Sequence, residues 1–248
     1  PPKGLFLLYI SPLRALTRDL SQSLQKVIFE MGSEMKVEVR TGDTTASARS
    51  RQLKKMPPVL FTTPESLSLM LSYPGSKDWL GSVRAAVVDE WHELIASKRG
   101  TQTLIGLERL RAWNPALRTW GLSATLGNLE EAAQTLVGTD RPFHLIRAQL
   151  PKEIELDPVA PDHIDSFPWA GHLGLKLLPK LVQSLSAQKS TLIFTNTRSQ
   201  CERWHEALCE ALPTMADRIA IHHSAMDREE REDVEEGLRS GEIKWVVC

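Results

Sequence analysis

Two adjacent carboxylates, Asp89 and Glu90, follow the apolar run Ala85–Val88, and a histidine, His92, comes two residues later. The run has the composition of a buried strand, and open α/β proteins bind ligands beyond the carboxyl ends of parallel strands. Adjacent side chains leave the backbone in different directions, so the two acids can serve separate roles. The first can hold a hydrated Mg²⁺, and the second can orient or deprotonate an attacking water.

This pattern is the Walker B arrangement of nucleoside triphosphatases. Read alone it has a competing explanation, because an acidic pair also occurs wherever a strand meets a polar loop. The rest of the chain must therefore decide between the two interpretations.

Strands and helices are predicted to alternate around the acidic pair. The predicted strands are 5–10, 37–39, 59–62, 85–88, 117–122, 191–195, 219–221 and 243–247. The predicted helices are 16–28, 46–55, one that begins at 63–65, 101–112, 129–137, 173–187, one that begins at 199–202 and 227–240. Thr63 and Pro64 supply a cap and a first-turn proline, and Ser199 with Glu202 reads as a capping box. The alternation predicts an α/β fold with parallel, doubly wound sheets.

Residues 148–170 interrupt the pattern with four prolines, which is typical of a linker. We therefore expect one domain over 1–147 and a second over 171–248, both incomplete. The first starts without a preceding strand–helix pair, and the second ends on a strand.

The composition is that of a globular protein, with 248 residues, 42% hydrophobic and 25% charged. The formal charge of −1 argues against binding nucleic acid through bulk positive charge. Locally, residues 1–55 hold ten Lys and Arg against five acids, whereas 222–242 hold three Arg against eight acids. The first region can form a groove for phosphates, although ordinary solvated helix faces would give the same count.

Three cysteines, Cys201, Cys209 and Cys248, give neither a disulfide framework nor a metal-ligand spacing. The chain has no apolar run near the ~20 residues of a membrane span, and its start does not resemble a signal peptide. We expect a reducing cytoplasmic location.

A series of short motifs in a fixed order resembles the superfamily 2 helicases, which are built from two RecA-like domains. The matching segments are Ser11–Leu16 (motif Ia), Thr63–Glu65 (Ib), Asp89–His92 (II, of the DExH type), Ser123–Thr125 (III), Ile193–Arg198 (IV) and His222–Arg228 (before motif V). Within the superfamily, the sequences of these motifs are most similar to those of the large helicase-related (Lhr) proteins. Among these they most resemble the branch of the bacterial ligase-associated DNA damage response helicases. The segments Trp120–Thr125, Pro168–Gly174 and Thr195–Gln200 carry that finer resemblance.

The resemblance implies a role for each motif. Asp89 would position Mg²⁺ through water, Glu90 would align the hydrolytic water, and His92 would hydrogen-bond toward motif III. Ser123 and Thr125 would couple nucleotide state to the nucleic-acid track. Four residues would contact the phosphodiester backbone without reading bases: Arg14, Thr63, Thr195 and Arg198. The cofactors would be ATP and Mg²⁺.

Three family motifs do not occur in these 248 residues. No Gly-x-x-x-x-Gly-Lys-[Ser/Thr] phosphate loop is present, since Gly75-Ser76-Lys77 lacks the required spacing, and motifs V and VI are also missing. We therefore expect an internal piece of a longer helicase that would lack turnover when isolated.

The leading expectation is part of an ATP-dependent DNA helicase or translocase that moves on single-stranded DNA and acts in DNA repair. DNA-repair proteins would be its partners, and the location would be a bacterial cytoplasm, associated with the nucleoid. One alternative is an RNA helicase of the DExH or DEAD type. The other is a non-catalytic nucleic-acid-binding fragment.

Overall fold

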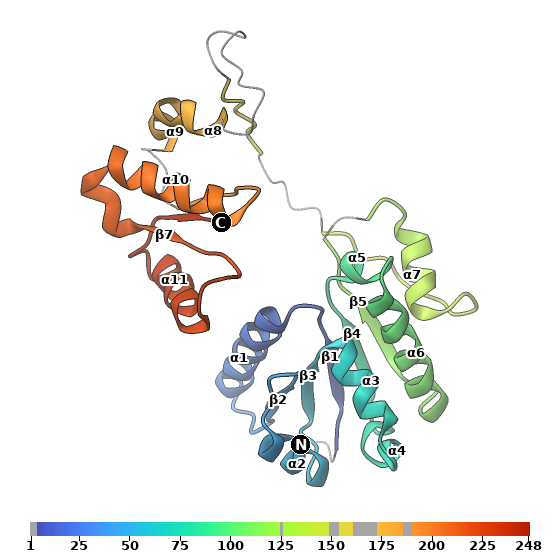
Figure 1. Cartoon of the computed structure of the whole chain (residues 1–248). Coiled ribbons are helices and arrows are strands. Elements are labelled where there is room, and N and C mark those ends of the chain that lie inside the picture. The colour runs from blue at the N-terminus through green and yellow to red at the C-terminus, as the bar shows by residue number, and fades with distance from the viewer. Residues whose placement is uncertain (1–3, 125, 149–153, 161–172, 186–189) are drawn as a thin grey trace. The chain divides into compact units, whose positions relative to one another are not determined.

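The computed structural model describes residues 4–124, 126–148, 154–160, 173–185 and 190–248 (Figure 1). The chain divides into two compact units, Pro1–Gln149 and Leu150–Cys248, and each is described by itself. Within the described ranges, none of the helices combines the length and the apolar character that crossing a membrane requires.

The first unit is built on a five-stranded sheet. Its strands are β1 (Leu7–Ile10), β2 (Val37–Arg40), β3 (Val59–Thr62), β4 (Ala85–Val88) and β5 (Arg118–Gly121). Its helices are α1 (Arg14–Glu30), α2 (Ala46–Lys54), α3 (Pro64–Ser72), α4 (Ser76–Leu80), α5 (Trp91–Leu94), α6 (Lys98–Trp113) and α7 (Leu129–Val137). All strand pairs are parallel, in the order β2-β3-β1-β4-β5, so the predicted α/β class with parallel sheets is confirmed.

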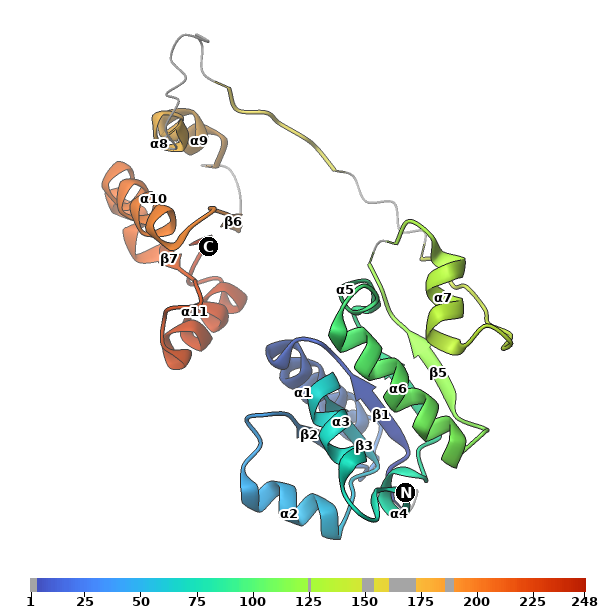
Figure 2. The same ribbon diagram turned by 45° about the vertical axis from the view of Figure 1, so that its right-hand side comes forward.

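The strand order contains a switch point between β1 and β4. The connection after β1 leads toward β2, whereas the connection after β4 leads the opposite way to β5. Right-handed crossovers then place α1 on one face and α3 and α6 on the other. The two helices α3 and α6 lie side by side (Figures 1 and 2). The carboxyl ends of β1 and β4 are therefore where a ligand site is expected.

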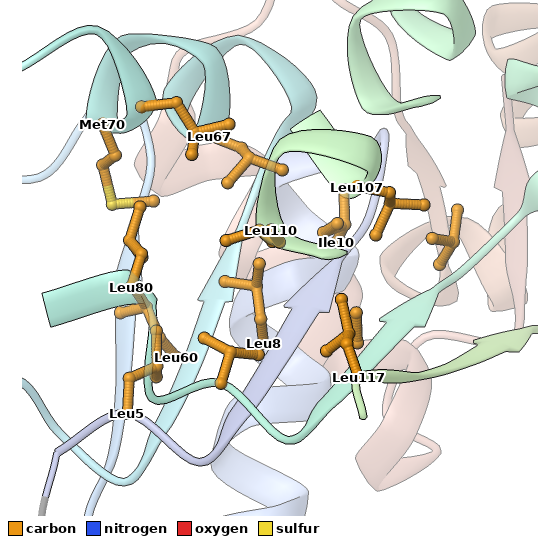
Figure 3. Packing of buried hydrophobic residues seen from close by; sticks show 14 of the residues in the cluster. Leu5, Leu8, Ile10, Leu60, Leu67, Met70, Leu80, Leu107, Leu110 and Leu117 are labelled. Carbon is orange, nitrogen blue, oxygen red and sulfur yellow. The ribbon is translucent and has the colours of Figure 1, made fainter. Parts of the chain in front are cut away.

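The core of this unit lies between the sheet and the α3–α6 pair. Leu8 and Ile10 of β1 and Leu107 and Leu110 of α6 are almost completely buried and lie close together (Figure 3). Burying a leucine side chain contributes about 1.5–3 kcal/mol. Gly106 of α6 lets the helices approach, because a Cβ there would lie 3.1 Å from a Leu67 methyl of α3.

The second unit has a smaller sheet. Its strands are β6 (Thr191–Ile193), β7 (Ile219–Ile221) and β8 (Trp245–Val247), all parallel in the order β6-β8-β7. Its helices are α8 (Leu173–Lys176), α9 (Leu178–Leu185), α10 (Arg198–Ala211), the short 3₁₀ helix η2 (Pro213–Arg218) and α11 (Arg228–Ser240). The buried residues include Leu208, Trp245 and Val247.

Two local predictions for the second unit are wrong. The helix expected over 173–187 is divided at Leu177, because Pro179 has no N–H to donate to the carbonyl four residues earlier. The residues beyond Leu185 in that helix lie outside the described part. The capping box expected at Ser199 is not used: α10 begins at Arg198, and the Thr197 hydroxyl accepts the Gln200 N–H at 3.2 Å. Both residues can cap a helix, and the chain uses the earlier one.

Candidate functional site

Asp89 lies directly beyond β4, at the switch point. Its backbone N–H donates to the Ile10 carbonyl of β1 at 2.8 Å, which extends the sheet by one residue. One carboxylate oxygen, Oδ1, accepts the N–H of Glu90 at 2.9 Å. Only 8% of Asp89 is exposed, so the charge sits at the sheet edge in a fixed place.

Glu90 adopts a left-handed backbone conformation, with φ 50° and ψ 45°. It is the one non-glycine residue with a positive φ in the described part of the chain. For an L-residue this conformation costs roughly 1–2 kcal/mol. Such strain persists where the surroundings over-determine the backbone, and functional sites are enriched in it. The turn ends the strand and starts the short helix α5.

Trp91, directly after the turn, is buried and holds it in place through two hydrogen bonds. The side chain is 2% exposed, and its indole N–H donates to the Ala132 carbonyl of α7 at 3.0 Å. Its backbone N–H donates to the Leu122 carbonyl at 2.9 Å. Trp91 is therefore a packing residue.

His92 and Ser123 are in contact, as the resemblance predicted. His92 Nδ1 lies 3.2 Å from Ser123 Oγ, and the Ala124 N–H donates to the same nitrogen at 3.4 Å. A backbone N–H can only donate, so Nδ1 accepts in this arrangement and the proton of a neutral ring is on Nε2. Glu90 Oε2 is 3.5 Å from Nδ1, so the ring lies between the proposed water-orienting acid and motif III.

Tyr9 was not among the predicted site residues. It lies on β1 in register with Val87 of β4, and its ring stacks on Phe61 with centroids 4.4 Å apart. Burial raises the pKa of the Tyr9 phenol strongly, and a hydrogen bond with Asp89 and the Asp89 charge raise it further. The phenol therefore stays protonated and donates toward Asp89. A tyrosine near the carboxyl end of an otherwise apolar strand is the signal that could have pointed to it.

The acids fit a magnesium ion that is held mainly by waters and phosphates. The described residues contain no group of three or more His, Cys, Asp or Glu side chains that could enclose a metal. Mg²⁺ commonly takes one or two protein carboxylates and keeps several waters. A single, nearly buried Asp89 meets that requirement, whereas a structural metal cage is not formed.

The two predicted phosphate-contacting residues of the first unit differ in exposure. Arg14 begins α1 and is largely exposed, and its Nη1 donates to Asp43 Oδ1 at 2.9 Å over the turn at Gly42. Thr63 is 2% exposed, and its hydroxyl caps α3 by accepting the Ser66 N–H at 3.4 Å. The predicted cap is confirmed. The Thr63 hydroxyl is thus engaged within the unit, and the Leu67 N–H donates to the Thr63 carbonyl at 2.9 Å.

The two predicted residues of the second unit lie where β6 leads into α10. The Thr195 hydroxyl donates to the Cys248 carbonyl at 2.8 Å and lies beside a groove that Arg203 and Trp204 also line. Arg198 is exposed, and its Nη2 donates to Ser224 Oγ at 2.9 Å. Motif IV therefore contacts the segment His222–Arg228. Thr125, the second predicted coupling residue, lies outside the described residues.

Much of the positive charge in residues 1–55 is used internally. Arg51 pairs with Glu38, and Arg49 donates to the carbonyls of Thr41 and Gly42. Arg40 is buried, and burial lowers the pKa of its guanidinium. The excess of basic residues in the sequence therefore overstates the charge that this surface offers to phosphates.

The cysteines are packing residues. Cys201 is 1% exposed, and its thiol donates to the Val247 carbonyl at 3.0 Å. Burial raises the pKa of all three thiols, which keeps them protonated and unreactive near neutral pH.

Two family models match the chain. The DEAD/DEAH box helicase model covers residues 2–132, and the helicase conserved C-terminal domain covers 174–248. The chain belongs to the DEAD/DEAH box helicases. This helicase chain is 38% identical over 256 residues to the ATP-dependent helicase Lhr-Core of Methanocaldococcus jannaschii, with 98% of the chain and 29% of that protein covered. It is 29% identical to the Lhr helicase/uracil glycosylase of Escherichia coli, with 98% and 19% covered.

One solved structure agrees with this family, and a second agrees with the fold. The helicase Lhr of Mycobacterium smegmatis, bound to ssDNA and AMP-PNP, matches with a TM-score of 0.80 and 32% identity, over 99% of the chain and 34% of that protein. The helicase MrfA, bound to DNA and AMPPNP, matches with a TM-score of 0.77 at 22% identity, over 98% and 35%, and supports the fold alone. The Lhr-type resemblance and the RecA-like fold are thus confirmed. The chain spans about a third or less of the length of these relatives.

Proposed function

We propose that this chain is part of an ATP-dependent DNA helicase or translocase that couples ATP hydrolysis to movement on single-stranded DNA. One observation carries the proposal: Asp89 and Glu90 lie at the switch point of a parallel sheet, and His92 connects them to motif III through Ser123. The names of the Lhr relatives and the ssDNA and AMP-PNP in the mycobacterial Lhr structure support it.

At the nucleotide site, Asp89 would hold Mg²⁺ and Glu90 would orient the water. Bound Mg²⁺ would neutralise the charge that develops on the transferred phosphoryl group. His92 Nδ1, which accepts the Ala124 N–H, lies 3.5 Å from Glu90 Oε2 and so borders the proposed water-orienting acid. The Tyr9 phenol and the Glu90 N–H hold Asp89 in place, which limits the reorganisation needed at the site.

His92, Ser123 and Thr125 would couple this site to the nucleic acid. The ring of His92 contacts both Glu90 and Ser123, so a change in the hydrogen bonding of Glu90 alters the contact to motif III. A His92→Ala variant would therefore lose stimulation by nucleic acid to a greater extent than it loses ATP binding.

Arg14 and Thr63 of the first unit, and Thr195 and Arg198 of the second, would hold the phosphodiester backbone of one strand. Guanidinium groups, hydroxyls and helix N-termini bind phosphates regardless of sequence, which suits a motor. We assign residues 1–147 and 171–248 to two RecA-like domains joined by 148–170. DNA repair proteins as partners, and a cytoplasmic, nucleoid-associated location in a bacterium, complete the proposal.

The deciding experiment measures ATP hydrolysis by the full-length protein with oligodeoxythymidylate and with the matching oligouridylate. We expect stimulation by the DNA strand. Stimulation by RNA alone would favour an RNA helicase, and oligodeoxyuridylate, which lacks only the 2′-hydroxyl of oligouridylate, would then attribute the preference to that group. Strand binding without any ATP hydrolysis would instead favour a non-catalytic nucleic-acid-binding role.

A further inference from the structure

Arg99, at the start of α6, bridges motif Ia and motif Ib. Its Nη2 donates to the Pro12 carbonyl at 2.7 Å, and its Nε and Nη2 both donate to the carboxylate of Glu65. Pro12 precedes the start of α1, and Glu65 lies in the first turn of α3. One guanidinium thus joins the two segments that carry Arg14 and Thr63.

The N-terminus of α6, which carries Arg99, is hydrogen-bonded to the helix that follows the acids of motif II. Ser97 caps α6 by accepting the Gly100 N–H at 3.2 Å and donates its own hydroxyl proton to the Leu94 carbonyl of α5 at 2.8 Å. Gly100 packs directly on that carbonyl, because a Cβ there would lie 2.0 Å from the Leu94 oxygen. The backbone position of Arg99 is therefore set by the helix that follows Asp89 and Glu90.

The partners of Arg99 require a guanidinium. Glu65 and the Pro12 carbonyl lie on separate elements, and only a planar group with several fixed donors reaches both. Burial by itself raises the pKa of Glu65. Hydrogen bonds from Arg99, from the Glu65 backbone and from Thr63, together with the Arg99 charge, outweigh it and leave this pKa below the ordinary value. The carboxylate is therefore fully ionised near neutral pH and keeps its ion pair with Arg99.

We infer that Arg99 is a positioning residue that fixes motif Ia and the N-terminus of α3 as one phosphate-binding platform, linked through α6 to the acids of motif II. This inference rests on the proposed function, because it concerns the grip on the same nucleic-acid strand. Arg99 acts through the Pro12 carbonyl and Glu65, and not by contacting the strand.

The test uses Arg99→Lys, Arg99→Ala and Glu65→Gln in the full-length protein, with oligodeoxythymidylate as the probe. Arg99→Lys keeps the charge but cannot serve both partners, so we expect it to weaken strand binding nearly as much as Arg99→Ala, by about three- to tenfold. The strand concentration for half-maximal ATPase should rise by the same factor, with a smaller change in the rate at saturating strand. Full affinity in Arg99→Lys would show that Arg99 supplies charge alone and would overturn the inference.

Glu65→Gln tests whether strand affinity rises or falls when this carboxylate is neutralised. Removing a negative charge near bound phosphates would by itself strengthen strand binding. The bridge predicts the opposite, since the weakened hold on Arg99 loosens the platform. Tighter binding by Glu65→Gln would contradict the inference. The matched controls are the single variants Arg239→Lys and Glu236→Gln. These residues form an exposed ion pair on α11, and neither substitution should change strand binding.

Amide hydrogen exchange separates this inference from the proposed function. In Arg99→Ala, the peptides that cover 10–17 and 63–67 should both exchange faster, whether or not the wild-type protein binds a strand. Unchanged exchange in both peptides would overturn the positioning role. Faster exchange in a protein that binds no DNA would support the bridge and reject the DNA-motor proposal.

Discussion

The two units end their strands in different ways. In the first, β4 is followed by a nearly buried Asp89, a strained Glu90 and a buried Trp91 that anchors the turn to α7. In the second, the residues after β6 are more exposed, and their hydrogen bonds are made to loop carbonyls and to another exposed side chain, Ser224. A five-stranded sheet supports the first edge and a three-stranded sheet the second.

This difference matches two kinds of chemistry. Orienting a water requires a carboxylate held within a narrow range of positions, so the surroundings must be rigid. Holding a phosphodiester backbone of any sequence requires exposed donors that accept several geometries. The buried edge beyond β4 would therefore supply hydrolysis, and the exposed residues after β6 would supply grip together with Arg14 and Thr63 of the first unit.

The largest stability contrast should come from two helical glycines. A Cβ on Gly100 in the first unit would meet the fixed backbone oxygen of Leu94, whereas a Cβ on Gly237 in the second would meet the movable side chain of Ile243 at 2.8 Å. We expect Gly100→Ala to cost about 3 kcal/mol or more and Gly237→Ala about 1 kcal/mol or less. Amide exchange of β4 and β8 in the full-length protein measures each unit separately. Equal losses of stability in the two variants would contradict the claim that the first unit is the more rigid.

Trp91→Phe should have the next largest effect. It removes the indole N–H, leaves the buried Ala132 carbonyl without this donor, and costs about 1–3 kcal/mol in the first unit. Exchange of the α7 amides should rise together with that of β4. The matched control is Trp120→Phe on β5, whose side chain is 53% exposed and should tolerate the change.

The stability cost of removing an N-cap can be compared between the two units at Thr63 and Thr197. Thr63 and Thr197 both cap a helix by accepting the N–H three residues later. Replacing either by Ala should cost about 1 kcal/mol, with a further loss at Thr63 because its methyl group is buried. The corresponding Ser variants retain the hydroxyl and should recover most of the cap. A larger loss at Thr197 than at Thr63 would contradict the assignment of the more rigid edge to the first unit.

The smallest effect is the acid dependence of the Arg99–Glu65 bridge. The pKa of Glu65 is lower in the folded state than in the unfolded chain, so its contribution is complete above the unfolded value of about 4.3 and is lost as pH falls through the folded value. Wild type and Glu65→Gln should therefore differ in stability at pH 7 and converge below that range. Amide exchange of α3 at both pH values checks this. A difference that grows toward acid pH would reverse the assigned sign.

The sequence predicted the alternating fold and the position of the acidic pair directly after β4, because buried parallel strands read as apolar runs. The roles of Asp89 and Glu90 stay predictions. The sequence also predicted the His92–Ser123 contact through the motif series. It did not identify Tyr9 or Arg99, since each acts through residues that are distant in the sequence. The capping box at Ser199 was wrong because two cap-competent residues lie two positions apart, and local chemistry does not choose between them. The roles of Arg14, Thr63, Thr195 and Arg198 stay predictions.

Glu90→Gln tests the central claim most directly. The full-length variant should lose about 10²–10⁴-fold in ATP hydrolysis, because the amide cannot take a proton from water, and it should still bind oligodeoxythymidylate in an ATP-dependent manner. The exposed Glu130→Gln at the start of α7 is the control and should keep full activity. ATP hydrolysis at the wild-type rate in Glu90→Gln would show that the acid pair beyond β4 is not the hydrolytic site.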